Sequence, residues 1–435
     1  AVRAAAPLAR NLEAACEKRP LRRWHPQRQA LQLLGGFNKG QPTAWALRGS
    51  RIVGPHPLLW SLKAIIDARF MAMFRRSRSM DSSEAMACRG CAAKLAAGPL
   101  ESALEQAGIA ELGTHPEDAA LLPLKKALGT APVLQSVDGF PALVSDPWLN
   151  GRLTALHACS DLWACGARVL AAQAVVTLPQ TIESTQGTLL AQTLAGIRSA
   201  LDPQGAQLIG GHTLEARDGI AQPPLSKAVQ ITLSVSGQAV QKFWPKAGLQ
   251  EGDRLLLSRP IGTGVLFAAA MHGAAPASAL DAALEQMSTS QHFLLEGLLE
   301  LQTEHPNAVH AATDITGFGL LGHLGEMLRN PALNVVLNGL KIPALPGALS
   351  LLAKGYSSSL APANRRAWGL LDSGSVNLQL AGIDPASKEH QAMLELLVDP
   401  QTCGPLLITL HADIAKKLTS EPQSPWTDIG SIQRR

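Results

Sequence analysis

The stretch AATDITGFGLLGHLGEM at residues 311–327 constrains the fold more than any other part of the sequence. Its apolar start leads to Thr313 and Asp314, and the turn from Gly317 to Gly319 then opens a second apolar run with helical spacing. This order predicts a strand, a glycine turn and a helix, with a carboxylate at the junction. A helix N-terminus offers free N–H groups to phosphate, and Asp314 would hold a hard cation such as Mg²⁺ on the phosphate oxygens. The alternative is that Thr313 and Asp314 only cap the helix.

Length and composition favour a globular protein of more than one domain. A chain of 435 residues exceeds a comfortable single core, and 46% hydrophobic with 17% charged residues is typical of soluble proteins. No apolar run is long enough to span a bilayer, and no charged and apolar leader precedes the rest, so we expect neither membrane insertion nor secretion. Six scattered cysteines are too few for a disulfide framework and favour a reducing cytoplasm.

The net charge of +4 arises partly from basic residues near the N-terminal end. The run Arg75-Arg76-Ser77-Arg78 has no interleaved aromatic residues, which favours a solvated linker over a nucleic-acid interface. We therefore expect no nucleic-acid partner.

Changes in composition predict four segments. Residues 1–74 form a small accessory domain with Trp24, Trp45 and Trp60 close together, and its last part, 58–74, has the spacing of an amphipathic helix. Residues 75–87 are polar and serine-rich, as expected of a linker. Residues 88–245 form a second domain and 246–435 a third, because a new strand and an Ile-Gly-Thr-Gly turn follow position 250.

Cys88 and Cys91 have CxxC spacing, but a zinc site would need a second pair that the sequence lacks. Cys91 lies three residues before Lys94, whose ammonium group would favour a thiolate. The alternative is an ordinary loop cysteine.

Carboxylates recur at the ends of predicted elements. Glu117 and Asp118 follow His115 and Pro116 before an apolar run. Asp138 ends a β-like segment, and Asp161 lies within a predicted helix at 151–166. Each acid alone is explained by exposure to solvent, but Asp118, Asp138, Asp161 and Asp314 together predict a polyphosphate and metal site.

The sequence Gly210-Gly211-His212-Thr213 follows a short predicted strand at 206–210. A turn of this kind can present backbone N–H groups to phosphate. The alternative for His212 is a hydrogen-bonded structural histidine.

Residues 86–435 resemble the selenophosphate synthetase (selenide, water dikinase) family. The resemblance rests on an ordered set of motifs: GCAAK at 90–94, EDAA at 117–120, SVDGF at 136–140, SDLWACG at 160–166, GGHT at 210–213, RPIGTGVL at 259–266, ATDITGFGLLGHL at 312–324 and DPQTCGPLL at 399–407. It implies an α/β aminoimidazole-ribonucleotide synthetase-like fold of two domains, in which the first dimerises through its sheet and the second closes over a nucleotide. Residues 10–45 and 58–74 resemble the C-terminal end of a pyridine-nucleotide-disulphide (NADH dehydrogenase-like) oxidoreductase, without its nucleotide fingerprints.

The resemblance also implies roles for single residues. Cys91 and Lys94 would be catalytic, and the metal ligands would be Asp118, Asp161 and Asp314. Nucleotide contacts would come from Lys94, His115, Pro116, Glu117, Asp138, Asp161, Gly211, His212 and Thr213, the last three reaching the ATP of a partner subunit. The implied reaction is ATP, selenide and water to selenophosphate, AMP and phosphate, with Mg²⁺, a homodimer and possible delivery of selenium by another protein. Two alternatives are another ATP-dependent kinase of the same superfamily, such as thiamine-phosphate kinase, and a non-catalytic nucleotide-binding remnant.

Several positions depart from the family pattern. Ala93 replaces a frequent second cysteine, and Glu117 replaces the first Asp of an acidic pair. Cys403-Gly404-Pro405 stands where Ser-Gly-Gly is usual, and proline removes an N–H donor. The sequence also ends before the last strand that we expect.

Overall fold

The computed structural model describes residues 2–23, 25, 31–38, 40–75, 88–95, 97–98, 100–101, 117–122, 131–216, 228–240 and 242–435. The chain divides into two compact units, Ala1–Ala85 and Met86–Arg435. Apart from Arg75, the predicted linker lies outside the described residues. None of the helices in the described ranges combines the length and the apolar character that a membrane crossing requires.

The smaller unit contains a three-stranded sheet, and one helix precedes the sheet in the sequence while another follows it. Helix α1 (Val2–Cys16) precedes the antiparallel strands β1 (Gln32–Asn38), β2 (Gln41–Arg48) and β3 (Arg51–His56), and helix α2 (Pro57–Arg75) follows. The helix predicted over 58–74 is confirmed by α2. Phe37 and Trp60 pack with ring centroids 6.2 Å apart, which joins α2 to the sheet. Many other apolar side chains of this unit are exposed, including Leu8, Ile52, Val53 and Leu58.

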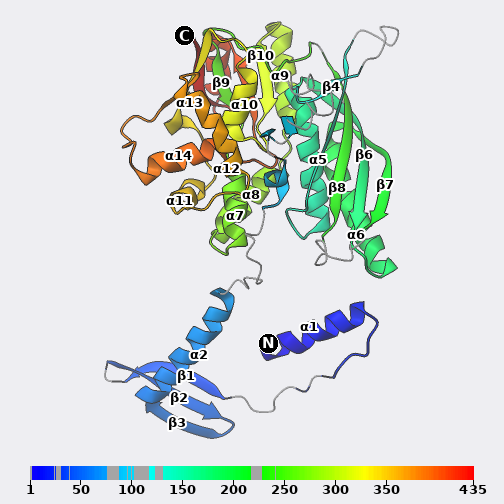
Figure 1. The fold of residues 1–435 in the computed structure, drawn as a ribbon. Helices are drawn as coiled ribbons and strands as arrows, with labels where there is room; N and C mark the ends of the chain where they lie inside the picture. Colours follow the sequence, from blue (N-terminus) through cyan, green and yellow to red (C-terminus); the bar gives the residue numbers. More distant parts are fainter. Residues whose placement is uncertain are drawn as a thin grey trace. The chain divides into compact units, whose positions relative to one another are not determined.

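The first sheet of the larger unit has the order β4-β5-β8-β6-β7 (Figure 1). Its strands are β4 (Ala120–Leu121), β5 (Val133–Phe140), β8 (Gln230–Ala239), β6 (Ala167–Leu178) and β7 (Gln207–Glu215). All neighbours are antiparallel except β6 and β7, which are parallel and joined by a helix. Residues of β6 alternate between buried and exposed, as expected of a sheet covered on one face.

Two helices, α5 (Pro147–Ala164) and α6 (Glu183–Leu201), cover that buried face. Asp146 caps α5 by accepting a 2.9 Å hydrogen bond from the Leu149 N–H, and Pro147 occupies the first turn. The helix therefore starts four residues before the predicted Gly151. Nearly all residues from Asn150 to Ala164 are buried, so α5 lies inside the protein on all sides.

The second sheet has the order β10-β13-β9-β14-β11-β12. Its strands are β10 (Val309–Asp314), β13 (Leu406–Leu410), β9 (Arg254–Leu257), β14 (Thr427–Arg434), β11 (Leu333–Asn338) and β12 (Val376–Gln379). Residues 427–434, near the end of the given sequence, form β14 between β9 and β11.

Helices cover both faces of the second sheet. The helices of this half are α7 (Thr263–Met271), α8 (Ala277–Ser288), α9 (His292–Glu304), α10 (Gly319–Met327), α11 (Ala348–Ala353), α12 (Ala361–Asn364), α13 (Gly369–Asp372), α14 (Lys388–Val398) and α15 (Ala412–Thr419), with the short 3₁₀ turns η4 (Gly339–Lys341) and η5 (Arg365–Trp368). Two further 3₁₀ turns, η1 (Gly90–Ala93) and η3 (Asp202–Gln204), precede them in the chain. Strand β13 is buried throughout. The side chains of Leu406 and Ile408 join the core around α5, and Leu407 joins the core on the other face.

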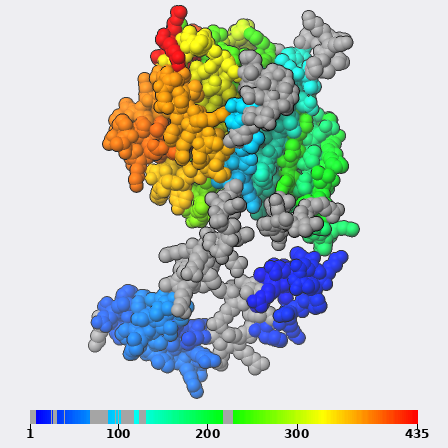
Figure 2. Space-filling model, viewed as in Figure 1, coloured from blue at the N-terminus to red at the C-terminus, as the bar shows by residue number. Residues whose placement is uncertain are grey.

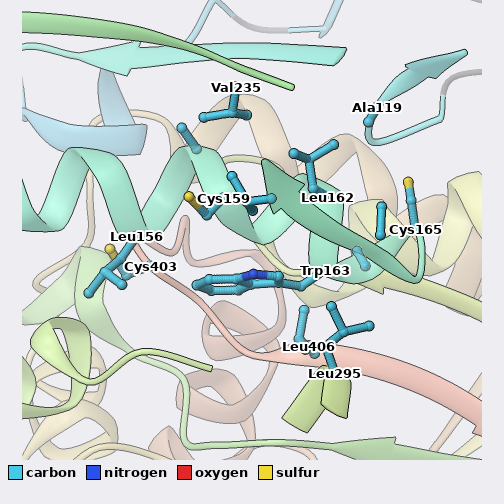
Figure 3. Close-up of a cluster of buried hydrophobic side chains, with 14 of the residues drawn as sticks. Ala119, Leu156, Cys159, Leu162, Trp163, Cys165, Val235, Leu295, Cys403 and Leu406 are labelled. Atoms are coloured by element: carbon cyan, nitrogen blue, oxygen red, sulfur yellow. The ribbon is translucent and has the colours of Figure 1, made fainter. Parts of the chain in front are cut away.

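Helix α5 thus connects the two sheets. Figure 3 shows Trp163 of α5 beside Leu406 of β13 and Leu295 of α9, and Cys403 beside Leu156. In Figure 2 the light-blue start of the larger unit lies between the yellow and orange C-terminal residues and the green residues of the first sheet. The loop at residues 88–95 is therefore placed where the two halves of this unit meet.

The close packing of α5 on α6 depends on glycine. A Cβ atom added at Gly196 would lie 1.9 Å from the Trp148 carbonyl oxygen, whereas one added at Gly187 of the same helix would meet nothing within 4 Å. We expect Gly196→Ala to lower the free energy of unfolding by about 2 kcal/mol or more, because backbone must move. Gly187→Ala should raise it by roughly 0.5–1 kcal/mol through helix propensity. Urea denaturation of both variants measures the difference, and equal effects would contradict the packing argument.

Candidate active site

Three aspartates from distant parts of the chain converge in the larger unit. Asp118 precedes β4, Asp161 lies on α5 and Asp314 ends β10, and one carboxylate oxygen from each lies within 4.8 Å of the other two. Hydroxyl groups hold the carboxylates: Ser136 donates to Asp161 (2.5 Å), Thr313 donates to Asp118 (3.2 Å) and Ser160 donates to Asp314. The structure thus brings together the three residues that the sequence predicts as metal ligands.

The cluster carries more negative charge than the protein around it neutralises. Burial raises the pKa of Asp161 well above its ordinary value, and the charges of Asp314, Asp138 and Asp118 raise it further. Burial likewise raises the pKa of Asp118 to about 6, against the opposite effect of Lys246. In the parts of the chain that the structure describes, no lysine or arginine forms an ion pair with Asp161 or Asp314. An oxygen-only donor set of this charge fits a hard divalent cation.

Lys246 is the cation that the cluster does contain. Its Nζ lies 2.5 Å from Asp118 Oδ1 and 3.0 Å from Glu326 Oε2, and its side chain is 5% exposed. The two carboxylates raise the pKa of Lys246 although burial opposes them. The Lys246 N–H also donates to Glu117 Oε2 at 3.0 Å, so Glu117 supports the lysine rather than the aspartate cluster. Sequence reasoning missed Lys246, which follows a proline near the predicted domain boundary without any motif.

The capping interpretation of Asp314 is wrong. Helix α10 begins at Gly319, its N-cap residue is Phe318, and no side chain caps it. Asp314 is instead the last residue of β10, and the Thr313 hydroxyl is directed to Asp118 and to the Asp314 carbonyl oxygen. The strand, turn and helix predicted over 311–327 are confirmed.

The loop that carries Cys91 is fixed by the turn at residues 399–405. The Cys91 N–H donates to Thr402 Oγ1 at 3.1 Å, and a Cβ at Gly90, where φ is +65°, would lie 2.7 Å from the same oxygen. Thr402 in turn donates its N–H to Thr263 Oγ1 at 3.0 Å. Cys91 is 7% exposed and lies in a buried turn rather than in an open loop.

Cys91, Lys94 and Asp138 line one cavity of about 110 Å³, together with His157 and Gly317. The Lys94 ammonium lies 4.6 Å from the centre of the Phe318 ring, a cation–π contact that holds it at the cavity. Burial would raise the pKa of Asp138, but His157 and, more weakly, Lys94 bring it below its ordinary value. The cavity is therefore lined by a thiol, a cation and an ionised carboxylate.

His157 is a second residue that sequence reasoning missed. It lies on α5 one turn before Asp161, with a side chain only 2% exposed. Its Nε2 lies 3.0 Å from Cys91 Sγ and 3.1 Å from Asp138 Oδ2, and its Nδ1 accepts a 3.1 Å hydrogen bond from the Cys403 N–H. Its spacing of four residues from Asp161, which places both on one helix face, is the signal that could have pointed to it.

The GGHT segment does not form the predicted turn. Gly211, His212 and Thr213 lie within β7, the edge strand of the first sheet, and pair in parallel with Ala174, Val175 and Val176 of β6.

The segment also lies away from the Cys91 cavity. His212 and Val137 line a separate hollow of about 290 Å³. Successive strand residues point to opposite faces, and Asp138 points to α5, so the hollow next to Val137 faces away from that helix. Within one chain the structure therefore does not bring these residues to the carboxylates. His115 and Pro116 lie outside the described residues.

The unusual Cys403-Gly404-Pro405 sequence forms a well-bonded turn. Cys403 has φ of +48°, Arg259 donates to the carbonyl oxygens of Cys403 and Gly404, and the Pro405 carbonyl accepts from the Ile315 N–H at 2.8 Å. Burial lowers the pKa of Arg259 to about 10, with Cys403 and Asp314 opposing that effect. The missing N–H of Pro405 therefore leaves the local geometry intact.

Two known domain families match most of the larger unit. AIR synthase related protein, N-terminal domain, matches residues 116–239, and AIR synthase related protein, C-terminal domain, matches residues 250–433. Among solved structures, thiamine monophosphate kinase from Aquifex aeolicus has a TM-score of 0.51 at 14% identity and covers 78% of this chain and 94% of its own. A chain of a HypE–HypF complex has a TM-score of 0.52 at 17% identity, and the match covers 77% of this chain and 93% of that chain. These structures show the fold alone, and the predicted fold class is confirmed.

Curated relatives are more specific. The selenide, water dikinase of Nitratidesulfovibrio vulgaris is 32% identical over 371 residues, which cover 82% of this chain and 96% of the relative. Those of Desulfitobacterium hafniense (strain Y51) and Pelobacter propionicus are 31% and 30% identical, and cover 80% and 79% of this chain and 94% and 91% of the relatives. Since identity at this level extends over nearly the whole length of these relatives, the chain belongs to the selenide, water dikinase family.

Proposed function

We propose that this chain is a selenophosphate synthetase, which converts ATP, selenide and water to selenophosphate, AMP and phosphate. One observation carries the proposal: the cluster of Asp118, Asp161 and Asp314 lies one turn of α5 from the cavity that contains Cys91 and Lys94. A polyphosphate site and a reactive thiol would therefore be adjacent. The product would supply selenium for selenocysteine or selenouridine synthesis.

The three aspartates would hold Mg²⁺. A bound cation would neutralise phosphate oxygens and bring them to the cluster. The surplus of buried negative charge supports this assignment, because a divalent cation relieves the repulsion that raises the pKa of Asp161.

Lys94 and Asp138 would act on the substrates at the cavity. The Lys94 ammonium would stabilise negative charge that develops on the transferred phosphoryl group, and Asp138 would contact the nucleotide. Cys91 would be the catalytic thiol. His115, Pro116 and Glu117 would add nucleotide contacts, as would Asp161 next to its cation.

A homodimer would complete the site. Apolar side chains on the strands of the first sheet remain exposed in one chain, among them Val137, Val175, Ile209 and Leu214. An exposed apolar sheet face supports pairing of two such sheets. Gly211, His212 and Thr213 lie on this sheet and would then reach the ATP of the partner subunit.

The remaining assignments follow from the family and from composition. The enzyme would act in the cytoplasm. Its two synthetase domains would meet near residue 245, and another protein would deliver selenide. Residues 1–74 would be the C-terminal remnant of a fused flavin oxidoreductase. The exposed apolar side chains of the smaller unit, such as Phe37 and Ile52, support an origin in a larger domain.

The activity is tested by assaying the chain with ATP, Mg²⁺ and selenide. We expect AMP and selenophosphate, detected by ³¹P NMR, and Cys91→Ser should lower turnover on the order of 100-fold or more. Cys16→Ser is the matched control, since Cys16 is exposed in the smaller unit. A kinase that does not use the thiol would tolerate both substitutions equally, and folded wild-type protein without selenophosphate formation would refute the activity.

The metal assignment is tested with Asp314→Asn. The substitution keeps an oxygen that can coordinate but removes a charge, so the Mg²⁺ concentration for half-maximal activity should rise about tenfold. Thermal stability should not fall, because one of three repelling carboxylates has gone. Asp281→Asn on the exposed side of α8 is the matched control. An unchanged Mg²⁺ dependence would contradict the assignment of Asp314.

The pH dependence of thermal stability should also reveal whether Mg²⁺ binds at the three aspartates. Burial and the neighbouring carboxylates raise the pKa values of Asp118 and Asp161 in the folded protein. Without metal, the stability that these groups permit at low pH is therefore lost as pH rises, which for Asp118 occurs through a pKa of about 6. Mg²⁺ binds the ionised carboxylates, and its increase in Tm should therefore be larger near about pH 8 than near about pH 5.5. Differential scanning fluorimetry with NaCl of equal ionic strength as reference measures it. A Tm increase independent of pH would indicate binding elsewhere.

A further inference from the structure

His157 makes more specific contacts than a buried structural histidine requires. Its ring contacts groups from three distant segments: the loop of Cys91, strand β5 with Asp138, and the turn with Cys403. We propose that His157 is a positioning residue for Cys91, whose Nε2–H donates to the sulphur atom and stabilises its thiolate form. The proposal rests on the proposed function only in taking Cys91 as the reactive thiol.

The backbone of Cys403 determines which ring nitrogen carries the proton. The Cys403 N–H donates to Nδ1 at 3.1 Å, so this nitrogen must offer its lone pair. A charged ring has no lone pair on Nδ1, so this bond requires the neutral ring, in which the proton lies on Nε2. His157 therefore presents an N–H donor at Nε2.

The turn is built to hold that amide in place. Cys403 has the left-handed φ of +48°, and its thiol donates to the Leu153 carbonyl of α5 at 3.2 Å. Arg259 binds its carbonyl oxygen from the other side. Figure 3 shows Cys403 against Leu156, within the same helix as His157. The Phe140 ring meets the imidazole edge-on, with centroids 5.4 Å apart, and restricts the ring further.

The Nε2 proton faces two acceptors. Cys91 Sγ lies at 3.0 Å and Asp138 Oδ2 at 3.1 Å, so one hydrogen is shared between a sulphur and a carboxylate. Among the described residues, the other charged groups near this cluster include Lys94 from the same loop, Arg259 behind the turn and Asp161, whose charge interacts with that of Asp138. A hydrogen bond donated to a thiolate stabilises it relative to the thiol. A ligand that engages Asp138 would leave the proton to Cys91 and increase this effect.

The labelling rate of Cys91 as a function of pH tests the proposal without any turnover. Iodoacetamide reacts with thiolates, and peptide mass spectrometry quantifies each cysteine separately. His157→Asn leaves an oxygen for the Cys403 N–H but is too short to reach the sulphur. We expect the midpoint of Cys91 labelling to rise by about one pH unit in this variant. His157→Gln places an amide N–H near the Nε2 position and should restore most of the shift.

Cys88 is an internal control in the same samples. It is buried in the same loop but contacts Ser359 and not His157. Its labelling should stay unchanged. A rise in labelling of Cys88 and Cys91 together would show a loosened loop, and a midpoint for Cys91 equal to wild type in folded His157→Asn would show no hydrogen-bonding role. Either result overturns the proposal.

A measurement on the unsubstituted protein covers the case in which His157→Asn does not fold. ¹⁵N NMR of the histidine side chains distinguishes protonated from unprotonated ring nitrogens, and the signals missing from His157→Gln assign His157. Protonation at Nε2 is expected, and a neutral ring protonated at Nδ1 alone would overturn the proposal. If the synthetase assay fails while the labelling shift is present, the proposed function is refuted and the role of His157 stands.

Discussion

Burial of α5 on every side is the constraint on which the site depends. A helix surrounded by protein can contain polar side chains only where each has a partner, because an unsatisfied buried group costs about 1–3 kcal/mol. His157, Ser160 and Asp161 meet this requirement through groups on other segments: the Cys91 loop, β10 and β5. The helix that joins the two sheets hydrophobically therefore also fixes where the loop, the strand end and the turn must lie relative to one another.

The charged cluster has the opposite energetic character. Asp118, Asp161 and Asp314 repel one another, and Lys246 with its buried contact to Glu326 compensates only part of that repulsion. Such an arrangement is maintained by the hydrophobic contacts around it and not by its own interactions. It is the expected form of a site whose stability is completed by a ligand, with the hydroxyl groups of Ser136 and Ser160 orienting the oxygens in advance.

How far the sequence predicts the protein depends on the range of the interactions. Asp161 is predictable because an acid between Cys159 and Leu162 is expensive to bury without a cation. The turn predicted for the GGHT segment is wrong because glycines usually indicate a turn. Here Gly211 lies in a strand, and glycine is required because a Cβ atom would lie 2.0 Å from the Ala174 carbonyl oxygen. His157 is missed because its partners lie tens to hundreds of residues away. Strand β14 is missed because a polar segment becomes a strand only between neighbours that already exist.

The position of β14 between β9 and β11 affects how the second sheet can form while the protein is synthesised on the ribosome. Its residues pair with β9 on one side and β11 on the other, although both of these strands precede it by many residues. The sheet therefore stays in two separate pieces until residues 427–434 have emerged. Until then, β9 with Leu255 and β11 with Val335 each lack the strand that pairs with both of them. Pairings of this range form slowly and leave strand edges open meanwhile. The nascent chain is therefore exposed to mispairing for longest in its C-terminal half, and chaperone binding during translation should concentrate there.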